Sequence, residues 1–284
     1  MWRIIDVLTW CEKKFKSIGI ETSRLDSEIL VAHALNFNRL QLYLNYDRPL
    51  TKLELANIKN LIKKRIKRIP VAYIIGKKEF MGLDFNVIQG VFIPRPETEI
   101  LVEYLIDEIK KRNLRHGIDV CAGTGCIGIS LMYYCKNLKM KFLEVEPDSF
   151  KCLVTNIEKF SLNQNAICIK HDILDFNFNS KVDFVVSNPP YIPENEILEL
   201  EPEVSKYHKK ISLNGGKDGL KYYPVIISKF KKNLNPQGLI AFEVGYNQAE
   251  KVKSLLQQHG FITKVIKDYQ GILRHVIGYK TLLS

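Results

Sequence analysis

The run Asn188, Pro189, Pro190 and Tyr191 combines residue types that can hold a planar nitrogen group for chemistry. A proline fixes its own φ and has no backbone N–H, so the two prolines leave carbonyl oxygens of fixed direction. A substrate NH2 group can then donate to the Asn188 side-chain oxygen and to the Pro189 carbonyl, while Tyr191 offers a ring to stack on. The alternative is an ordinary proline-containing turn.

The lone pair of an amide-like or amino-aromatic nitrogen is delocalised, which makes it a poor nucleophile. Hydrogen bonds from both of its protons return electron density to the nitrogen, and positioning brings it in line with a methyl group. No dedicated general base is required, because the N-methylated amide cation is very acidic. The run therefore predicts methyl transfer to such a nitrogen.

Residues 123–128, which begin with Gly123, Thr124 and Gly125, have the pattern G-x-G-x-x-G. They lie between an expected strand and an expected helix. Such glycines let the backbone approach a ligand closely, and the helix N-terminus favours a negative group. Glu144 follows about twenty residues later at a strand end, where a carboxylate can accept both ribose hydroxyls. The pattern predicts a nucleotide site rather than a tight turn without a ligand. NAD and S-adenosylmethionine both present an adenosine ribose, so the motif does not separate them.

Asp172 and Ile173 follow the third expected strand of the sheet. The carboxylate could accept a hydrogen bond from an adenine amino group, and Ile173 could pack on the ring. A surface turn is the alternative interpretation of this acid.

Other reaction classes find little support. The six cysteines include no Cys-x-x-Cys pair and have no histidine at zinc-ligand spacing, so we expect reduced, mostly buried thiols and no metal. The six histidines form no triad pattern, and no Walker loop is present. The 284 residues carry a net charge of +11. This excess is compatible with nucleic acid, an acidic protein partner or a solvated lysine-rich surface.

The elements that must position these residues fall into three parts. Apolar residues at helical spacing predict a helical bundle over residues 1–70. Its last helix begins with a capping box at Thr51 and Glu54, ends before Pro70, and carries a basic outer face over residues 59–68. Residues 71–93 predict a β-hairpin connector. Residues 94–284 alternate strands and helices, which predicts a doubly wound, mostly parallel α/β sheet with an antiparallel strand near its end.

The longest apolar stretch, residues 126–135, is about half the length of a membrane span. Asp6 interrupts the start of the chain where a secretory signal needs an unbroken apolar core. We expect a cytoplasmic protein with no membrane partner.

The chain resembles the HemK/PrmC family, S-adenosylmethionine-dependent methyltransferases that modify the glutamine side-chain amide of peptide chain release factors. The resemblance runs nearly end to end and rests on six segments. They are Gly76 to Leu83, Phe92 to Glu99, Asp119 to Gly125, Asn188 to Tyr191 with Gly215 to Leu220, and Gly271 to Arg274.

The resemblance implies a class I methyltransferase sheet of seven strands and a small N-terminal helical domain that docks the release factor. It implies S-adenosylmethionine bound by Cys121, Ala122, Gly123, Thr124, Gly125, Glu144, Asp172, Ile173 and Asn188. It also implies that Asn188, Pro189, Pro190 and Tyr191 hold the glutamine of a Gly-Gly-Gln loop, with no obligatory nucleic acid.

Three departures from the family pattern concern these contacts. Cys121-Ala122 stands where Gly-Thr is common, and Glu144 replaces the more usual Asp, so a ribose contact requires the longer side chain to fold back. His208-Lys209 stands where Glu-Pro is common, which affects the substrate side of that loop.

Three rival functions remain at this point. A sister enzyme acting on a ribosomal protein glutamine shares the same motifs. A DNA amino-methyltransferase shares residues 188–191 and would suit the basic charge, but it usually needs a region for flipping and reading bases, and no insertion of that size is evident. A basic RNA-binding module on a retired methyltransferase scaffold would require loss of the cofactor site or the amide clamp.

Overall fold

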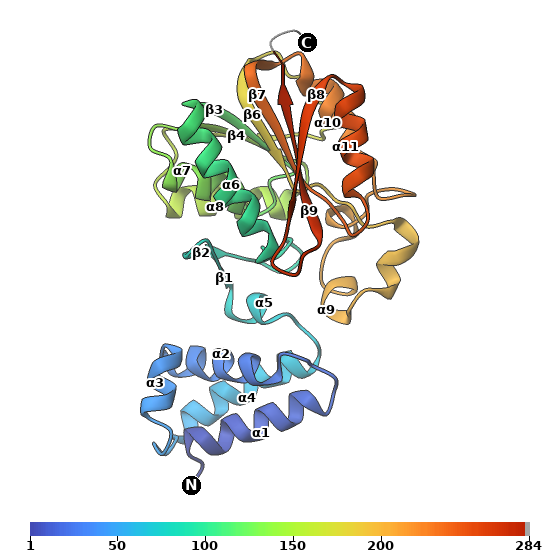
Figure 1. The fold of residues 1–284 in the computed structure, drawn as a ribbon. Coiled ribbons are helices and arrows are strands. Elements are labelled where there is room, and N and C mark those ends of the chain that lie inside the picture. The colour runs from blue at the N-terminus through green and yellow to red at the C-terminus, as the bar shows by residue number, and fades with distance from the viewer. Residues whose placement is uncertain (282–284) are drawn as a thin grey trace. The chain divides into compact units, whose positions relative to one another are not determined.

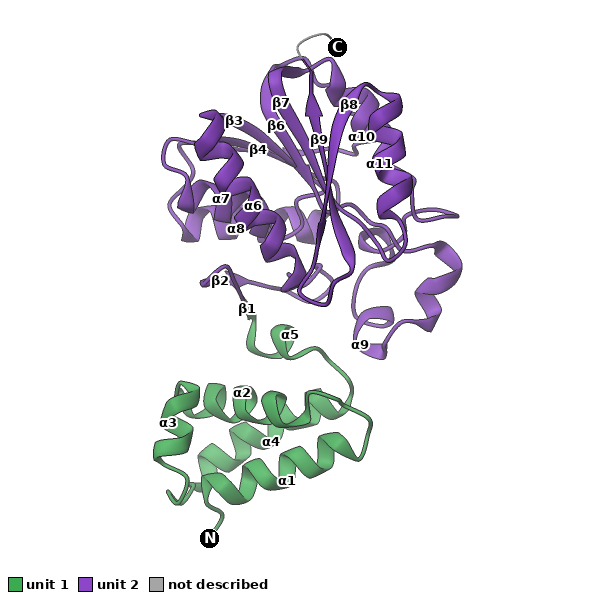
Figure 2. Ribbon diagram, in the orientation of Figure 1, with its two compact units in different colours: residues 1–77 green, residues 78–284 purple. Residues whose placement is uncertain are grey.

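Helices make up the first unit of the chain, residues 1–77, in the computed structural model, which describes residues 1–281 (Figure 2). They are α1 (Ile4–Lys16), α2 (Ser23–Leu35), α3 (Arg39–Leu44), α4 (Lys52–Ile66) and the single-turn α5 (Val71–Ile75). Their apolar faces meet in a core that includes Ile4, Phe15, Leu30 and Ile58. The helical spacing of the sequence therefore predicts this unit correctly, because each amphipathic helix buries its apolar stripe against its neighbours.

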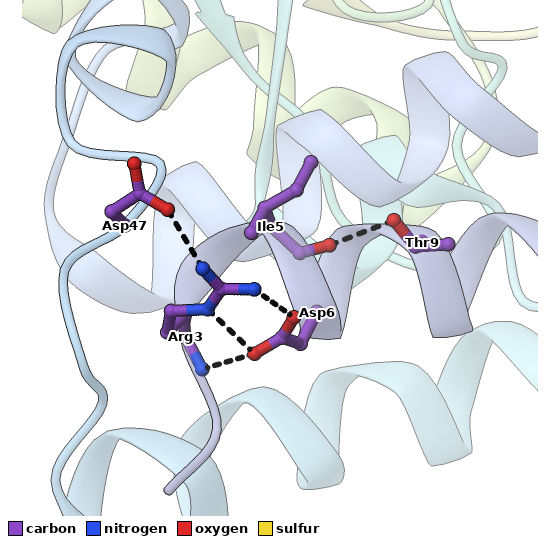
Figure 3. A network of polar contacts seen from close by, with 5 residues as sticks. All are labelled: Arg3, Ile5, Asp6, Thr9 and Asp47. Carbon is purple, nitrogen blue, oxygen red and sulfur yellow. Dashed lines mark hydrogen bonds and ion pairs between the residues drawn. The ribbon is translucent and has the colours of Figure 1, made fainter.

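Polar contacts fix the ends of these helices. At the start of α1, the Asp6 carboxylate accepts from the Arg3 backbone N–H (2.9 Å) and guanidinium, which also reaches Asp47 at 2.9 Å, and the Thr9 hydroxyl donates to the Ile5 carbonyl (Figure 3). A carboxylate in the first turn also complements the helix dipole.

The capping box predicted for α4 is present. The Thr51 hydroxyl accepts the Glu54 N–H at 3.2 Å and the Glu54 carboxylate accepts the Thr51 N–H at 2.8 Å. The helix ends at Ile66, earlier than expected, because Arg68 adopts a left-handed φ of 67° and donates to the carbonyls of Ile18 and Gly19. Part of the expected basic face therefore holds the turn between α1 and α2.

The connector differs in part from the expectation. Residues 71–75 form α5, and the hairpin is confined to β1 (Lys77–Phe80) and β2 (Leu83–Asn86). The β-branched and aromatic composition that predicts a strand here is overridden by a turn that follows Pro70 and ends at Gly76, whose φ is 74°.

A seven-stranded sheet forms the centre of the second unit, which starts at Lys78 (Figure 1). Its spatial order is β5 (Ala166–Lys170), β4 (Lys139–Glu144), β3 (His116–Val120), β6 (Val182–Ser187), β7 (Leu234–Glu243), β9 (Leu273–Lys280) and β8 (Phe261–Lys267). The first five strands in this order are parallel, and β9 runs antiparallel to both β7 and β8. The alternation of strands and helices in the sequence predicts this mixed topology correctly.

Helices cover both faces of the sheet, and each face has its own hydrophobic core. One core lies under α6 (Glu97–Arg112), α7 (Cys126–Tyr134) and α8 (Pro147–Lys159), and the other under α10 (Tyr222–Lys231) and α11 (Ala249–Gln258). Adjacent residues such as Phe142 and Leu143 belong to different cores, as the period of two in a strand requires. None of the helices in the described part of the chain is long and apolar enough to cross a membrane.

The segment between β6 and α10 is a long connection with short helical turns that the sequence does not predict. It contains η1 (Glu194–Glu199), α9 (Pro202–Ser205) and η2 (Lys210–Ser212). Turns of three to six residues are too short to show hydrophobic periodicity.

Candidate active site

The predicted site residues converge on one cavity of the second unit. It lies where β3, β4, β5 and β6 end, at the carboxyl edge where parallel sheets bind ligands. Its walls include Cys121, Ala122, Gly123, Thr124, Glu144, Asp172, Ile173, Asn188, Pro189, Pro190 and Tyr191. Gly125 is the one predicted site residue that does not line it.

The three glycines of the turn after β3 have different tasks. Gly123 has φ +58° and no atom within 4 Å of the position a Cβ would take, so its backbone is open to the cavity. At Gly125 and Gly128 a Cβ would lie 2.5 Å from Leu153 and 2.3 Å from Phe142. These two glycines therefore permit α7 to pack closely against α8 and β4, and the assignment of Gly125 to the cofactor stays a prediction.

Asp119 holds the same turn from below. It is 1% exposed, and its Oδ2 accepts the Gly128 N–H at 3.0 Å. Burial raises its pKa to about 7, with the nearby Glu144 acting in the same direction. Cys121 follows two residues later with a left-handed φ of 61°, a conformation that a glycine would adopt without strain.

Glu144 folds back as its extra methylene requires. One carboxylate oxygen accepts the N–H groups of Val145 and Glu146, both at 2.9 Å, and the other accepts the Gly123 N–H at 2.7 Å. A carboxylate offers about four acceptor positions, so roughly one is left for a ligand hydroxyl. Burial raises the pKa of Glu144, and the hydrogen bonds from these N–H groups oppose the shift.

Asp172 shapes the turn after β5. Its Oδ1 accepts the Leu174 N–H at 2.9 Å, which is an Asx turn, and Ile173 is 3% exposed with its side chain on the cavity wall. The turn interpretation and the ligand interpretation are therefore compatible, since only one carboxylate oxygen makes the turn.

The loop of residues 188–191 begins directly at the end of β6. Ser187 is the register partner of Val120 on β3, and its hydroxyl donates to the Val120 carbonyl at 2.5 Å. The Tyr191 carbonyl accepts from the Gln248 amide at 2.8 Å, and burial raises the pKa of the Tyr191 phenol, so it stays protonated. These contacts fix the two ends of the loop, at β3 through Ser187 and at the start of α11 through Tyr191.

Glycines from a distant segment make room for this loop. A Cβ at Gly219 would lie 2.3 Å from the Tyr191 carbonyl oxygen, and one at Gly215 would lie 2.8 Å from the Tyr191 Cα. The Ile192 N–H donates to the Leu213 carbonyl, and the Gly215 N–H returns a bond to the Ile192 carbonyl. The glycine segment that the resemblance singles out therefore serves close backbone packing behind Tyr191.

His208 and Lys209 support the wall of the cavity. The Lys209 ammonium contacts Glu146 at 2.5 Å and also Asp148, so it ties the 188–221 segment to the start of α8. His208 is buried against the Phe92 ring, and burial together with the positive charge of Arg95 lowers its pKa to about 4.

Three side chains near the site, those of Thr98, Glu99 and Glu243, were not predicted from the sequence as functional groups. The Thr98 hydroxyl donates to the Glu243 carboxylate at 2.5 Å, and the Glu99 carboxylate accepts the Met81 N–H at 2.7 Å. Thr98 and Glu99 lie within a segment on which the resemblance rests. The signal for Glu243 is weaker: an acid at the last position of an apolar strand.

This arrangement defines the class of protein. One cavity is lined by a glycine turn after β3, a carboxylate at the end of β4 and an Asn-Pro-Pro-Tyr loop after β6. In the same sheet, β9 lies antiparallel between β7 and β8. The open Gly123 backbone and the remaining acceptor position of Glu144 suit an adenosine ribose. The fold and site are those of a class I methyltransferase that uses S-adenosylmethionine.

Comparisons with known proteins agree. Residues 6–76 match the PrmC N-terminal domain and residues 83–201 match the methyltransferase small domain. The chain is 37% identical to a release factor glutamine methyltransferase of Clostridium acetobutylicum, covering 98% of this chain and 99% of that one. A protein of the same name from Aquifex aeolicus is 37% identical, covering 90% and 91% of the two chains. The chain belongs to the release factor glutamine methyltransferase family.

Among solved structures, a methyltransferase from Pyrococcus furiosus superposes with a TM-score of 0.52 at 21% identity, over 80% of this chain and 100% of that chain. A human methyltransferase 10 domain containing protein gives 0.51 at 19% identity, over 70% and 90%. These likenesses concern the fold.

Proposed function

We propose that this enzyme methylates the side-chain amide nitrogen of the glutamine in the Gly-Gly-Gln motif of translation release factors. The observation that carries the proposal is that Asn188 and Pro189 line the same cavity as Gly123 and Glu144. The chain that holds this cavity belongs to the release factor glutamine methyltransferase family. The names of the relatives support the release factor as the substrate.

In this proposal the cofactor is held by residues 121–124, Glu144, Asp172, Ile173 and Asn188. S-adenosylmethionine supplies a methyl group on a positively charged sulfur, which keeps the electrons of the broken carbon–sulfur bond. The Asn188 Oδ1 and the Pro189 carbonyl accept the two N–H groups of the target amide and orient its nitrogen. The rigid Pro189-Pro190 backbone pre-organises these acceptors, and Tyr191 packs against the amide plane.

The nitrogen forms its new bond to the methyl carbon and then loses one proton to solvent, which restores a neutral amide. This step needs no general base in the protein, because an N-alkylated amide cation is a strong acid. Orientation and hydrogen bonding are therefore the whole contribution expected from this chain's side chains.

We also propose that the helical unit, residues 1–77, contributes to docking the release factor. The match of residues 6–76 to the PrmC N-terminal domain supports this assignment. Deletion of this unit is expected to raise the KM for the release factor far more than the KM for a short Gly-Gly-Gln peptide.

The test is mass spectrometry of a purified release factor after incubation with the full chain and S-adenosylmethionine. One added methyl on the Gly-Gly-Gln glutamine is expected, and none on a release factor with glutamate at that position. An unmodified release factor, with cofactor binding demonstrated by calorimetry, would overturn the assignment. Ribosomal subunits and duplex DNA in parallel reactions separate the rival substrates.

A further inference from the structure

Glu243 is a buried carboxylate with no role in the chemistry proposed above. It is the last residue of β7 and is 2% exposed. Ser187 of β6 is the register partner of Phe242, so Asn188 and Glu243 leave the two neighbouring parallel strands side by side. Burying a carboxylate is costly, which makes its partners informative.

Two side chains from the cavity wall face this carboxylate. The Thr98 hydroxyl, 1% exposed at the start of α6, donates to it at 2.5 Å. The Asn188 side chain follows β6 beside it, and hydrogen bonding from Asn188 is among the causes that lower the pKa of Glu243 against the effect of burial. Thr98 and Asn188 both line the cavity, so Glu243 lies directly behind the wall that receives the target amide.

The chemistry of the groups fixes the direction of the second bond. An ionised carboxylate can only accept hydrogen bonds, and an asparagine amide has a donor end and an acceptor end. The NH2 end of Asn188 must therefore point to Glu243, which turns Oδ1 away from it. The reversed amide would set its oxygen against a carboxylate oxygen and present a donor to a substrate group that is itself a donor.

We propose that Glu243 is the positioning residue that fixes the orientation of the Asn188 amide, so that Oδ1 is presented to the substrate nitrogen. The inference rests on the proposed function, in which Asn188 Oδ1 accepts from the target amide. Thr98 holds the carboxylate in place through the hydroxyl bond. Glu243 acts through Asn188 and touches no reacting atom.

The ionisation of Glu243 agrees with this role at mildly alkaline pH. Burial raises its pKa to about 7, and the hydrogen bonds from Thr98 and Asn188 and the charge of Arg274 limit the rise, while Glu97 adds to it. Kinetic measurements at a pH of about 8.5 therefore compare variants with an ionised wild-type carboxylate.

The test is a double-mutant cycle between Glu243 and Asn188 in the full-length enzyme. Glu243→Gln keeps the shape but offers Asn188 both a donor and an acceptor, so both amide orientations become accessible; Glu243→Met offers neither. We expect kcat to fall by about 10-fold for Gln and by up to about 100-fold for Met, with the Kd for S-adenosylmethionine within about twofold of wild type. In an Asn188→Ala background the same changes should have no further effect on kcat.

A purely structural role gives a different pattern. Equal losses with and without Asn188, or a cofactor Kd that rises together with the loss in kcat, would overturn the inference. An independent measurement is hydrogen exchange of the Asn188 side-chain NH2 by 15N NMR, which should be slow in the wild type and faster in Glu243→Met. If the wild-type enzyme fails to methylate a release factor, the proposed function fails, and this exchange measurement still tests the orientation of Asn188.

Discussion

The Lys209 Nζ lies 2.5 Å from the Glu146 Oε1, across 63 residues of sequence, and so joins the loop beyond Tyr191 to the start of α8. Glu146 is buried and also caps α8 by accepting the Ser149 N–H at 2.7 Å. Its own N–H donates to Glu144, the proposed ribose acceptor. A single lysine therefore connects the proposed substrate side of the cavity to the proposed cofactor side.

Lys209→Met should weaken cofactor binding. Removal of the ammonium leaves the Glu146 carboxylate without its cation, at a cost of about 1–3 kcal/mol, and frees one wall of the cavity. We expect the Kd for S-adenosylmethionine to rise by roughly 10-fold by calorimetry. Lys210→Met is the matched control, because the Lys210–Glu194 pair is exposed and worth about 0–1 kcal/mol. Similar behaviour of the two variants would contradict this role for Lys209.

Asn188→Ala should separate binding from chemistry. In the proposed mechanism only the chemical step uses the Asn188 Oδ1 as an acceptor for the target nitrogen, whereas most proposed cofactor contacts come from the turns after β3, β4 and β5. We expect kcat to fall by roughly 10²-fold to 10³-fold, as for the loss of one pre-organised catalytic hydrogen bond, with little change in cofactor Kd. A parallel loss of cofactor affinity would mean that Asn188 chiefly supports the cofactor or the fold.

Gly219→Ala should displace the loop of residues 188–191. The added Cβ would lie 2.3 Å from the Tyr191 carbonyl oxygen, in a residue with a φ of 75°. Gly271→Ala provides the control, since φ is 82° there but no atom lies within 4 Å, so that only backbone strain of about 1–2 kcal/mol is expected. Thermal unfolding should report destabilisation in both, and methyl transfer should fall strongly in Gly219→Ala alone.

At Cys121 a glycine variant should be more stable than an alanine variant, the reverse of the usual order. Its left-handed φ of 61° favours glycine, so Cys121→Gly is expected to be more stable than Cys121→Ala by about 1 kcal/mol. Chemical denaturation of the two variants measures this directly. A more stable alanine variant would show that the loop has no strain at this residue.

Burial also raises the pKa of the Cys121 thiol, so slow alkylation by a thiol reagent at neutral pH is expected.

His275 should make the stability depend on pH. It is fully buried on β9, and burial lowers its pKa to about 4, with Arg274 acting in the same direction and the charge of Asp268 opposing it. Between about pH 6.5 and pH 4 the unfolded chain therefore binds a proton that the native chain does not, so stability falls as the pH falls through this range.

The free energy of unfolding, measured by denaturant titration from about pH 7.5 to pH 4.5, should fall for the wild type by about 2–3 kcal/mol more than for His275→Leu. His208, which has a similarly lowered pKa, is present in both proteins, and its contribution cancels in the comparison. A constant difference between the two proteins across this range would contradict the assignment.

Much of the fold and site could be predicted from the sequence because the relevant signals are local. The Thr51 capping box, the alternation of strands and helices, and the runs 121–124 and 188–191 are each contiguous, and strand ends in a parallel sheet meet at one edge. The sequence also identified Glu144 by its distance from the glycine turn. The short turns between residues 194 and 212 lacked any such periodic signal.

The contacts that complete the site could only be decided by tertiary structure. Thr98 and Glu243 are 145 residues apart, and Gly219 approaches Tyr191 only because two distant backbones pack together. The sequence by itself determined the class of the fold and which residues could hold a cofactor and an amide. The tertiary structure decided that Gly125, at the start of α7, packs against Leu153 of α8 and that Lys209 joins two walls of the cavity. It also decided that Glu243 stands behind Asn188, because burial and hydrogen-bond partners depend on which segments the fold brings together.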